Sequence, residues 1–452
     1  MESRRGIGDV GSNPSAAVNC KTISFGETMS IHKAIISRIR VSDHPDPTVH
    51  SLAVGTVCHE TVICGKDIPD GTLGIYFPCE LQLSEEFAVA NDLIRRKDAS
   101  GKAAGGMFDA NRRVRVQKFK GIKSVGFWTS LEALQKLGGD TASLKEGDQI
   151  DSWNGKPVCN KYVTQQTQRS LNLNKVKSKL KTRCVFPEHE DTKQFKHHVN
   201  NVKSGDNVVI TLKLEGTSQR IARNLEFRNP NFIERLVGKF FKLDLSRMIN
   251  LNGTRRVTLN YKKSQEPGYY PDAFREAVFN KIAPYLEEYM EIFIEVVGWS
   301  ESGKTIMPTH NLSKLQDKEI KKQYKDPIIF SYECKPNTFD FYVYRIAYVL
   351  PNSKTVDLCW GDVKKWCFKN NIKHAPELAS FVFDGNHRDL VDLVESLSDG
   401  PDPLNLNHPR EGVCIRVDST NWECYKNKGY SYKILNDIIK SSESYQDIEE
   451  VS

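Results

Sequence analysis

Hydrophobic and polar positions alternate in short runs between residues 30 and 160. Examples are HSLAVGTVCHETVICG, which starts at His50, and DGTLGIYFPCE, which starts at Asp70. Turn signals such as Asn154-Gly155 separate the runs, as is typical of short β-strands. A helical stretch, LSEEFAVANDLIRRKDASG, interrupts them. The pattern predicts a small β-barrel or sandwich with a helical insertion.

The pattern changes near residue 205, where longer apolar strands are mixed with amphipathic helices. The expected strands include DNVVITLKLEG, MEIFIEVVGW, DFYVYRIAYVL and EGVCIRVD, and the expected helices include YPDAFREAVFNKIAPYLEEYM and HRDLVDLVESLSD. This mixture predicts an α+β domain with antiparallel sheets flanked by helices. The predicted organisation is a mobile tail at 1–27, a β-rich domain at 28–160, a basic connector at 161–204, the α+β domain at 205–440 and an acidic tail at 441–452.

The composition is that of a globular protein with more than one domain. The length of 452 residues is enough for two or three domains, and 39% of the residues are hydrophobic. No stretch approaches the roughly 18 to 20 apolar residues that cross a bilayer, and the first residues lack the apolar core of a secretory signal. The 11 cysteines show no CxxC spacing, which favours reduced thiols in an intracellular protein of the cytoplasm or nucleus. We expect no membrane partner and no obligate protein partner.

Basic residues gather in the segment NRRVRVQKFKGIKSVGFW, which runs from Asn111 to Trp128. Apolar and basic positions alternate in part of it, so a strand would turn one face to a core and a cationic face outward. Basic grooves with aromatic side chains bind single-stranded nucleic acid, and this favours an OB-type barrel for 28–160. A solvated strand edge that lysines protect from aggregation is an equal alternative. The candidate nucleic-acid-binding residues are Arg112, Arg113, Arg115, Lys118 and Lys120.

A second basic run, NKVKSKLKTR from Asn174 to Arg183, carries a cation at every second position. In an extended chain these cations would share one side, and such a row favours a polyphosphate partner. A charged linker that repels itself and extends is the alternative, and the two interpretations are compatible.

Lys213 ends an apolar strand, NVVITLKLEG, which carries Val, Ile and Leu on both faces. Such a strand is buried on both sides, so the lysine emerges where water is scarce. A buried ammonium is costly unless its pKa falls or an anion pairs with it, and an amine with a lowered pKa is a good nucleophile. Gly216 would let the backbone turn away and leave room for a ligand. The alternative is a lysine that extends from the strand end to solvent.

Further candidate residues follow Lys213 in the same domain. They are Glu295 in FIEVVG, Tyr344 in DFYVYRI, Glu411 in REGVCIRV, and Lys426 and Lys428 in CYKNKGY. This order resembles the covalent nucleotidyltransferase superfamily, which comprises ATP-dependent DNA and RNA ligases and mRNA capping enzymes. KLEGTS is similar to the RNA ligase form of the KxxG nucleophile motif. The order of a front barrel, FPEHEDT, KLEGTSQR and GTRRV is similar to the Deinococcus-type RNA ligases.

The resemblance implies an ATP-dependent RNA ligase that joins 3′-OH and 5′-phosphate ends, with RNA or an RNA-containing duplex as its partner. Lys213 would form a covalent lysyl-AMP, and Glu295 would accept a hydrogen bond from the ribose. Tyr344 would stack on adenine, with a core tyrosine as the alternative. Glu411 would hold a divalent metal, Mg²⁺ or else Mn²⁺, since these ions prefer carboxylate and phosphate oxygens.

The remaining candidates are cations for phosphate groups. By the same resemblance, Lys426 and Lys428 would bind the α-phosphate and neutralise charge in the transition state. Arg220, Arg255 and Arg256 compete for a further phosphate contact, for which the arginine fork is well suited.

Three alternatives remain: a DNA ligase, a capping-type guanylyltransferase that uses GTP, and an inactive nucleic-acid-binding protein of the same fold. Capping enzymes and many DNA ligases carry an OB domain after the lysine pair, and only about 24 residues follow it here. This favours the RNA ligase. The polar insertion at 300–326 is either a substrate clamp or surface.

Overall fold

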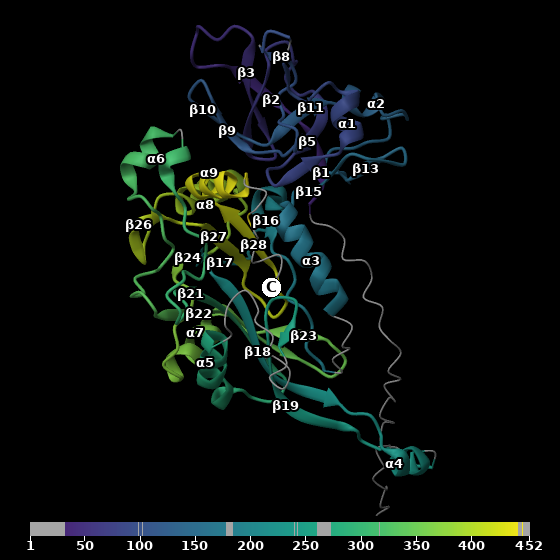
Figure 1. Ribbon diagram of the computed structural model, residues 1–452, viewed down its shortest axis with the longest axis vertical. Helices are drawn as coiled ribbons and strands as arrows, with labels where there is room; N and C mark the ends of the chain where they lie inside the picture. The colour runs from purple at the N-terminus through teal and green to yellow at the C-terminus, as the bar shows by residue number, and fades with distance from the viewer. Residues whose placement is uncertain are drawn as a thin grey trace, which may run out of the picture. The chain divides into compact units, whose positions relative to one another are not determined.

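The structure is a computed structural model, and it describes residues 32–97, 99–101, 103–177, 184–238, 240–241, 243–259, 273–315, 317–441 and 445. The predicted tail at 1–27 lies outside the described residues, and only Ser441 and Tyr445 are described in the predicted acidic tail. The prediction of antiparallel sheets combined with helices is confirmed (Figure 1). No helix in the described part of the chain is long and apolar enough to cross a membrane.

The N-terminal region, residues 32–163, consists of short strands and two short helices. They are β1 (Ala34–Arg38), β2 (Arg40–Asp43), β3 (Leu52–Val57), β4 (Glu60–Gly65), β5 (Leu73–Phe77), β6 (Leu81–Leu83), α1 (Glu85–Ala90), β7 (Arg96–Lys97), β8 (Ala103–Gly105), β9 (Val116–Phe119), β10 (Ile122–Val125), β11 (Phe127–Ser130), α2 (Glu132–Gln135), β12 (Gln149–Ile150), β13 (Ser152–Trp153), β14 (Lys156–Pro157) and β15 (Cys159–Lys161). The largest sheet has the order β11-β5-β1-β12. Its core joins Ile36 and Ile75 to Phe87 of α1 and Leu134 of α2.

The described ladders of this region do not close into a barrel. Besides the largest sheet, the strands form the separate sheets β2-β3-β4, β9-β10, β6-β15, β13-β14 and β7-β8. The OB-type barrel predicted for 28–160 is therefore not confirmed, whereas the many short strands and the helical insertion, α1, are observed. Alternation along a strand reports which face is buried, but it does not report which strands pair.

The connector contains a helix where an extended chain was predicted. Helix α3 (Gln165–Lys177) includes residues 174–177, so the predicted extended row of cations is wrong there, and residues 178–183 lie outside the described part. Positions two apart in a helix do not share a face. Strand β16 (Lys193–Gln194) then pairs in parallel with β28 (Cys424–Lys428). The 3-10 helices η1 (Phe195–His197) and η2 (Val199–Asn201) lead into the next domain.

Two sheets form the core of the C-terminal domain. Its other strands are β17 (Asn207–Lys213), β18 (Thr217–Phe227), β19 (Ser246–Gly253), β20 (Thr258–Leu259), β21 (Met290–Gly298), β22 (Phe339–Val349), β23 (Thr355–Asp357), β24 (Glu377–Val382), β25 (Pro401–Asp402), β26 (Asn405–Pro409) and β27 (Gly412–Val417). Its helices are α4 (Phe232–Val237), α5 (Ala273–Ile282), η3 (Ala283–Tyr285), η4 (Leu312–Lys314), α6 (Lys318–Gln323), α7 (Trp360–Lys369), α8 (His387–Ser398) and α9 (Tyr430–Lys440). The sheet orders are β16-β28-β27-β17-β24 and β20-β19-β18-β21-β22-β23.

Strand β17 is an internal strand of the five-stranded sheet, as its apolar pattern predicted. It pairs with β27 on one side and β24 on the other. Ile210 faces a core that includes Val394 of α8, whereas Val209 faces a second core with Ile292 of β21 and Trp360 of α7. Because β17 is buried on both faces, its last residue, Lys213, is held at a defined place beside the sheet.

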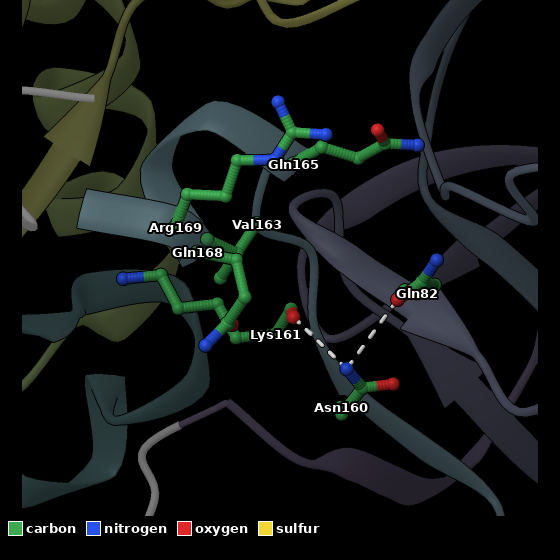
Figure 2. A pocket seen from close by; sticks show the side chains of 7 residues that line it. All are labelled: Gln82, Asn160, Lys161, Val163, Gln165, Gln168 and Arg169. Atoms are coloured by element: carbon green, nitrogen blue, oxygen red, sulfur yellow. Dashed lines mark hydrogen bonds between the residues drawn. The ribbon is translucent and has the colours of Figure 1, made fainter. Parts of the chain in front are cut away.

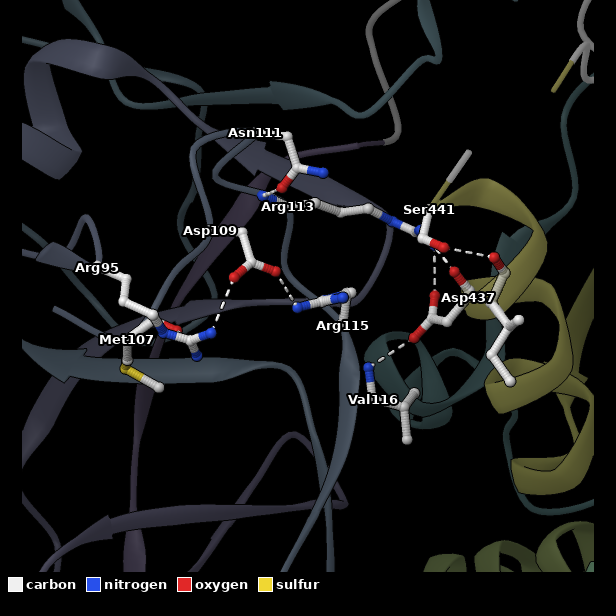
Figure 3. A network of polar contacts seen from close by, with 10 residues as sticks. Arg95, Met107, Asp109, Asn111, Arg113, Arg115, Val116, Asp437 and Ser441 are labelled. Carbon is white, nitrogen blue, oxygen red and sulfur yellow. Dashed lines mark hydrogen bonds and ion pairs between the residues drawn. The ribbon is translucent and has the colours of Figure 1, made fainter. Parts of the chain in front are cut away.

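Buried ion pairs connect the N-terminal region to the C-terminal domain. Arg113 pairs with Asp437 of α9, and both side chains are largely buried (Figure 3). Glu60 of β4 accepts hydrogen bonds from Lys433 of α9 at 3.2 Å and from Lys196 of η1 at 2.9 Å. Removing one partner of a buried ion pair is strongly destabilising, because the other charge is then buried without compensation. These contacts therefore determine how the N-terminal region meets α9.

Candidate active site

Three neighbouring strands bring Lys213, Glu411 and Lys428 together. Lys213 ends β17 opposite Gly412, the first residue of β27, and Gly412 lies opposite Lys428, the last residue of β28. Lys213 Nζ lies 2.8 Å from Glu411 Oε2, and Lys428 Nζ lies 3.3 Å from Glu411 Oε1. The Glu411 side chain is 0% exposed, whereas that of Lys213 is 18% exposed. One buried carboxylate thus holds two ammonium groups, and the predicted nucleophile remains accessible.

Gly412 makes this close arrangement possible. Its φ is +152°, and a Cβ atom at this position would lie 2.1 Å from the backbone oxygen of Asn427. Any side chain here would force β27 away from β28. The backbone oxygen of Glu411 accepts a hydrogen bond from the Gly429 amide at 2.9 Å, which holds Glu411 beside the end of β28.

Two tyrosines anchor the turn that follows Lys213. The amide of Glu215 donates to Tyr332 Oη at 2.6 Å, and Tyr432 Oη donates to Glu215 Oε2 at 2.6 Å. A Cβ atom at Gly216 would lie 2.5 Å from the backbone oxygen of Val296, so the predicted need for glycine has a structural cause. Sequence reasoning did not select either tyrosine. Tyr432 is 217 residues from Glu215, and no local pattern could connect them.

Glu295 and Tyr344 lie beside the same turn. A Cβ atom at Gly216 would also lie 2.9 Å from Glu295 Cγ. Ser218 of β18 is opposite Glu295 of β21, and Ser218 Oγ lies 3.1 Å from Tyr344 Oη. Burial, followed by the charge of Glu295, raises the pKa of the Tyr344 hydroxyl. The Tyr344 ring packs partly against the core, and its centre lies 5.8 Å from that of His189.

Lys426 lies in a strongly basic environment. Burial, and next the charge of Lys428, lower the pKa of Lys426 to about 8. The N-terminal region supplies an opposing charge through Glu80, which lies between β5 and β6. Burial alone would raise the pKa of Glu80, but Lys428, Lys440 and Lys426 hold it well below its ordinary value. Sequence reasoning missed Glu80, because no motif in its own segment marks it.

The three candidate arginines differ in their surroundings. Arg220 is buried, and its guanidinium donates to the backbone oxygens of Thr254, at 2.7 Å, and of Pro187. These bonds give Arg220 a structural role, namely holding the FPEHEDT segment. Arg255 and Arg256 both pair with Asp191 of that segment, and their side chains are 19% and 35% exposed. They are therefore the candidates that a phosphate could reach.

The basic strand does not form the continuous cationic face predicted for it. Arg113 is buried against Asp437, and Arg115 pairs with Asp109 at 2.5 Å (Figure 3). Lys118 bridges to Asp317, which precedes α6, at 3.3 Å. Arg112 Nε donates to the backbone oxygen of Leu83 at 3.1 Å, and Lys120 is exposed in the turn between β9 and β10. The cationic face was predicted from alternation alone. In the structure, Arg113 forms an ion pair with α9, and Lys118 forms one with the residue that precedes α6.

Glu411 fits a divalent cation that arrives with a nucleotide. Within the described residues, no group of three or more His, Cys, Asp and Glu side chains could hold a metal ion. Glu411 Oε1 is buried and, as far as the described residues show, accepts no hydrogen bond, although the Lys428 ammonium lies 3.3 Å away. Mg²⁺ in nucleotide enzymes is commonly held by one or two carboxylates together with phosphates. A single buried carboxylate suits that arrangement.

Comparisons with known proteins show the family and the fold of this chain. The sequence model of a protein family described as RNA ligase matches residues 206–435. This range includes the three strands that bring together Lys213, Glu411 and Lys428, called here the lysine–glutamate cluster. No curated protein matches the chain by sequence.

Solved structures of an RNA ligase from Naegleria gruberi are similar in fold. A mutant determined with ATP and Mn has a TM-score of 0.55 at 15% identity, over 91% of this chain and 99% of that chain. A mutant determined with AMP and Mn has a TM-score of 0.56 at 15% identity, over 92% and 100%. The form with PPi has a TM-score of 0.54 at 14% identity, over 89% and 97%. At these identities the likeness establishes a shared fold.

Proposed function

The chain belongs to the RNA ligase family, and on that premise we propose that it is an ATP-dependent RNA ligase that seals 3′-OH and 5′-phosphate ends, with nicks in duplexes as its substrate in RNA repair. The observation that carries the proposal is the contact of Lys213 with Glu411, beside Lys428. The order of the front β-region, FPEHEDT and KLEGTSQR further supports a Deinococcus-type ligase.

The first step would take place at Lys213. Its Nζ attacks the α-phosphorus of ATP, a nitrogen–phosphorus bond forms, the bond to the bridging oxygen breaks, and pyrophosphate leaves as the amine loses a proton. A covalent intermediate divides a difficult condensation into easier steps. The contact with Glu411 holds Nζ in one direction at the strand end, which reduces the freedom of the nucleophile. The ammonium would have to lose a proton first, because only the free amine has the lone pair that forms the new bond.

The surrounding residues would bind the nucleotide. Glu295 would bind the ribose and Tyr344 the adenine, and the contacts of both with Ser218 beside the KLEG turn support these roles. Lys426 and Lys428 neutralise the α-phosphate and stabilise the charge that develops there. A divalent cation held by Glu411 would compete with the two ammonium groups and lower the pKa of the nucleophile.

The later steps would act on RNA. The AMP group passes from Lys213 to the 5′-phosphate at the break, and an oxygen–phosphorus bond replaces the nitrogen–phosphorus bond. The 3′-OH then attacks the activated 5′-phosphate, a phosphodiester forms, and AMP leaves. Arg255 and Arg256 would bind the 5′-phosphate, and their partial exposure and shared pairing with Asp191 support this role.

Labelling with a radioactive nucleotide tests the proposal. Purified protein is incubated with Mg²⁺ and α-labelled ATP or GTP and then denatured and separated on a gel. We expect label from ATP on the wild type and on Lys369→Ala, a control at an exposed lysine of α7, and none on Lys213→Ala. Label from GTP alone would instead indicate capping chemistry. No label on folded protein that carries no AMP beforehand would indicate an inactive binding protein.

A further inference from the structure

A polar pocket lies between the N-terminal region and the start of α3, apart from the lysine–glutamate cluster. Its volume is about 430 Å³ (Figure 2). The lining residues, called here the amide pocket, are Gln82, Asn160, Lys161, Val163, Gln165, Gln168 and Arg169. They comprise two cations, four carboxamides and one valine, without a carboxylate, so the pocket is suited to an anionic ligand with hydroxyl groups.

Helix α3 presents one face to the amide pocket. Gln165, Gln168 and Arg169 follow the spacing i, i+3 and i+4, which places them on one side of the helix. Thr164 begins the helix, since its Oγ1 accepts from the Thr167 amide at 3.3 Å. All three side chains that face the pocket are therefore held by one rigid element, and Arg169 and Gln168 are exposed to a ligand.

The opposite wall belongs to the β6–β15 ladder. Asn160 is paired with Gln82, and Asn160 Nδ2 donates to Gln82 Oε1 at 3.4 Å (Figure 2). Gln82 Nε2 in turn donates to the backbone oxygen of Asn111 at 2.8 Å. These bonds orient the carboxamides of the wall before any ligand arrives.

The ladder also carries Lys161, a cation of the amide pocket whose charge influences a carboxylate of the active site. Lys161 is paired with Leu81, the residue after Glu80. Burial opposes ionisation of Asp191, but Arg255, Arg256, Lys426 and Lys161 together hold its pKa below its ordinary value. The charge of Lys161 thus acts on the same carboxylate as the arginines and lysine of the active site.

We propose that the amide pocket binds one ribose-phosphate unit of the RNA strand beside the break, with Arg169 and Lys161 on the phosphate and the carboxamides on the 2′-OH. The proposal rests on the proposed function and extends it to a second subsite. Cations and side-chain amides are common phosphate ligands. A carboxamide both donates and accepts, as a 2′-OH does, and the 2′-OH is the group that separates RNA from DNA. The pocket thereby favours RNA over DNA at one position outside the reacting ends.

Substitution of Arg169 tests the phosphate contact. Alanine is a good helix former, so Arg169→Ala retains α3, and Arg388→Ala on the exposed face of α8 is the matched control. Binding of a nicked RNA duplex is measured by fluorescence anisotropy without ATP at several salt concentrations. We expect about tenfold weaker binding for Arg169→Ala and a salt slope that is smaller by about 0.9, with no change for the control. Equal binding by both variants would overturn the proposal.

Single 2′-deoxy substitutions test the ribose contact. Each nucleotide within a few positions of the break is replaced in turn, and binding is measured for the wild type and for Gln168→Ala. We expect one position at which the 2′-deoxy group weakens wild-type binding several-fold and has no effect on Gln168→Ala. A uniform effect at every position, or the same effect in both proteins, would overturn the 2′-OH assignment.

Different measurements test the proposed ligase function and the proposed RNA subsite in the amide pocket. Lysyl-AMP labelling reports on the proposed function alone, and we expect Arg169→Ala to be labelled like the wild type. Absence of label on the wild type would count against the ligase, while the anisotropy measurement would still decide whether the amide pocket binds RNA.

Discussion

Glu411 Oε2 lies 2.8 Å from Lys213 Nζ, across the ladder that joins β17 to β27. Lys213, the proposed nucleophile, is therefore held by an ion pair and is only 18% exposed, unlike an ordinary lysine that extends from a strand end into solvent. It is paired with a carboxylate that is fully buried and that also faces Lys428 at 3.3 Å. Because one carboxylate neutralises two ammonium groups, any change of its charge alters the electrostatic environment of both Lys213 and Lys428.

Glu411→Gln should reduce lysyl-AMP formation by about 100-fold or more, since it leaves two partly buried ammonium groups without their anion and removes the candidate metal ligand. The initial rate of labelling from ATP is measured as the concentration of Mg²⁺ or Mn²⁺ is varied. The control is Glu288→Gln at an exposed carboxylate, and it should behave as the wild type. A Glu411→Gln protein with the rate and metal dependence of the wild type would contradict the role of Glu411.

Lys426→Arg should extend activity to higher pH. The pKa of Lys426 is about 8, so its charge is present below that pH and is lost as the pH rises through it. A contact from Lys426 to the α-phosphate weakens in the same window, and kcat/KM for lysyl-AMP formation should fall above about pH 8. Arginine stays protonated, so the fall should move upward by more than about one pH unit. An unchanged profile in a folded Lys426→Arg protein would argue against this contact.

Gly412→Ala should destabilise the protein and abolish labelling. The added Cβ would lie 2.1 Å from the Asn427 backbone oxygen, and alanine is strained at a φ of +152°. Separation of β27 from β28 would move Lys428 away from Glu411. Thermal unfolding and labelling are compared with Gly361→Ala on α7, where a Cβ would meet nothing within 4 Å. Gly361→Ala should be neutral or slightly stabilising, and equal behaviour of the two variants would refute the argument.

Arg113→Met should cost about 3 to 5 kcal/mol of unfolding free energy, because it leaves the Asp437 carboxylate buried without its partner. The double variant Arg113→Met with Asp437→Leu should lose much less, since no charge remains unpaired. Denaturant unfolding of both variants and of the wild type gives the comparison. Additive losses in the double variant would mean that the pair is not coupled.

The same ion pairs affect how the N-terminal region should be tested. Deleting that region would also leave Lys433 and Lys196 without Glu60, so a loss of activity would not separate RNA binding from folding. Point variants in the amide pocket avoid this problem, because Arg169 and Gln168 lie on an exposed helix face.

The sequence by itself determined that β17 is an internal strand, and it supplied the candidate residues of the active site. Val208, Val209 and Ile210 require burial on both faces, which only a central strand between covering layers provides. The order of Lys213, Glu295, Tyr344, Glu411 and the lysine pair in the chain indicated one site, and the strands bring Lys213, Glu411 and Lys428 into contact. Such features are local, since a pattern within about ten residues shows which face of a strand is buried.

Only the tertiary structure decided which groups those residues meet. Arg113 looked like part of a cationic face, but α9 supplies Asp437 from 324 residues away. Tyr432 donates a hydrogen bond to Glu215, and the charges of Lys426 and Lys428 lower the pKa of Glu80. The N-terminal strands form open ladders instead of the expected barrel. The physical reason is that strand pairing and charge pairing are set by contacts between distant segments, and periodicity along one segment carries no information about its partner.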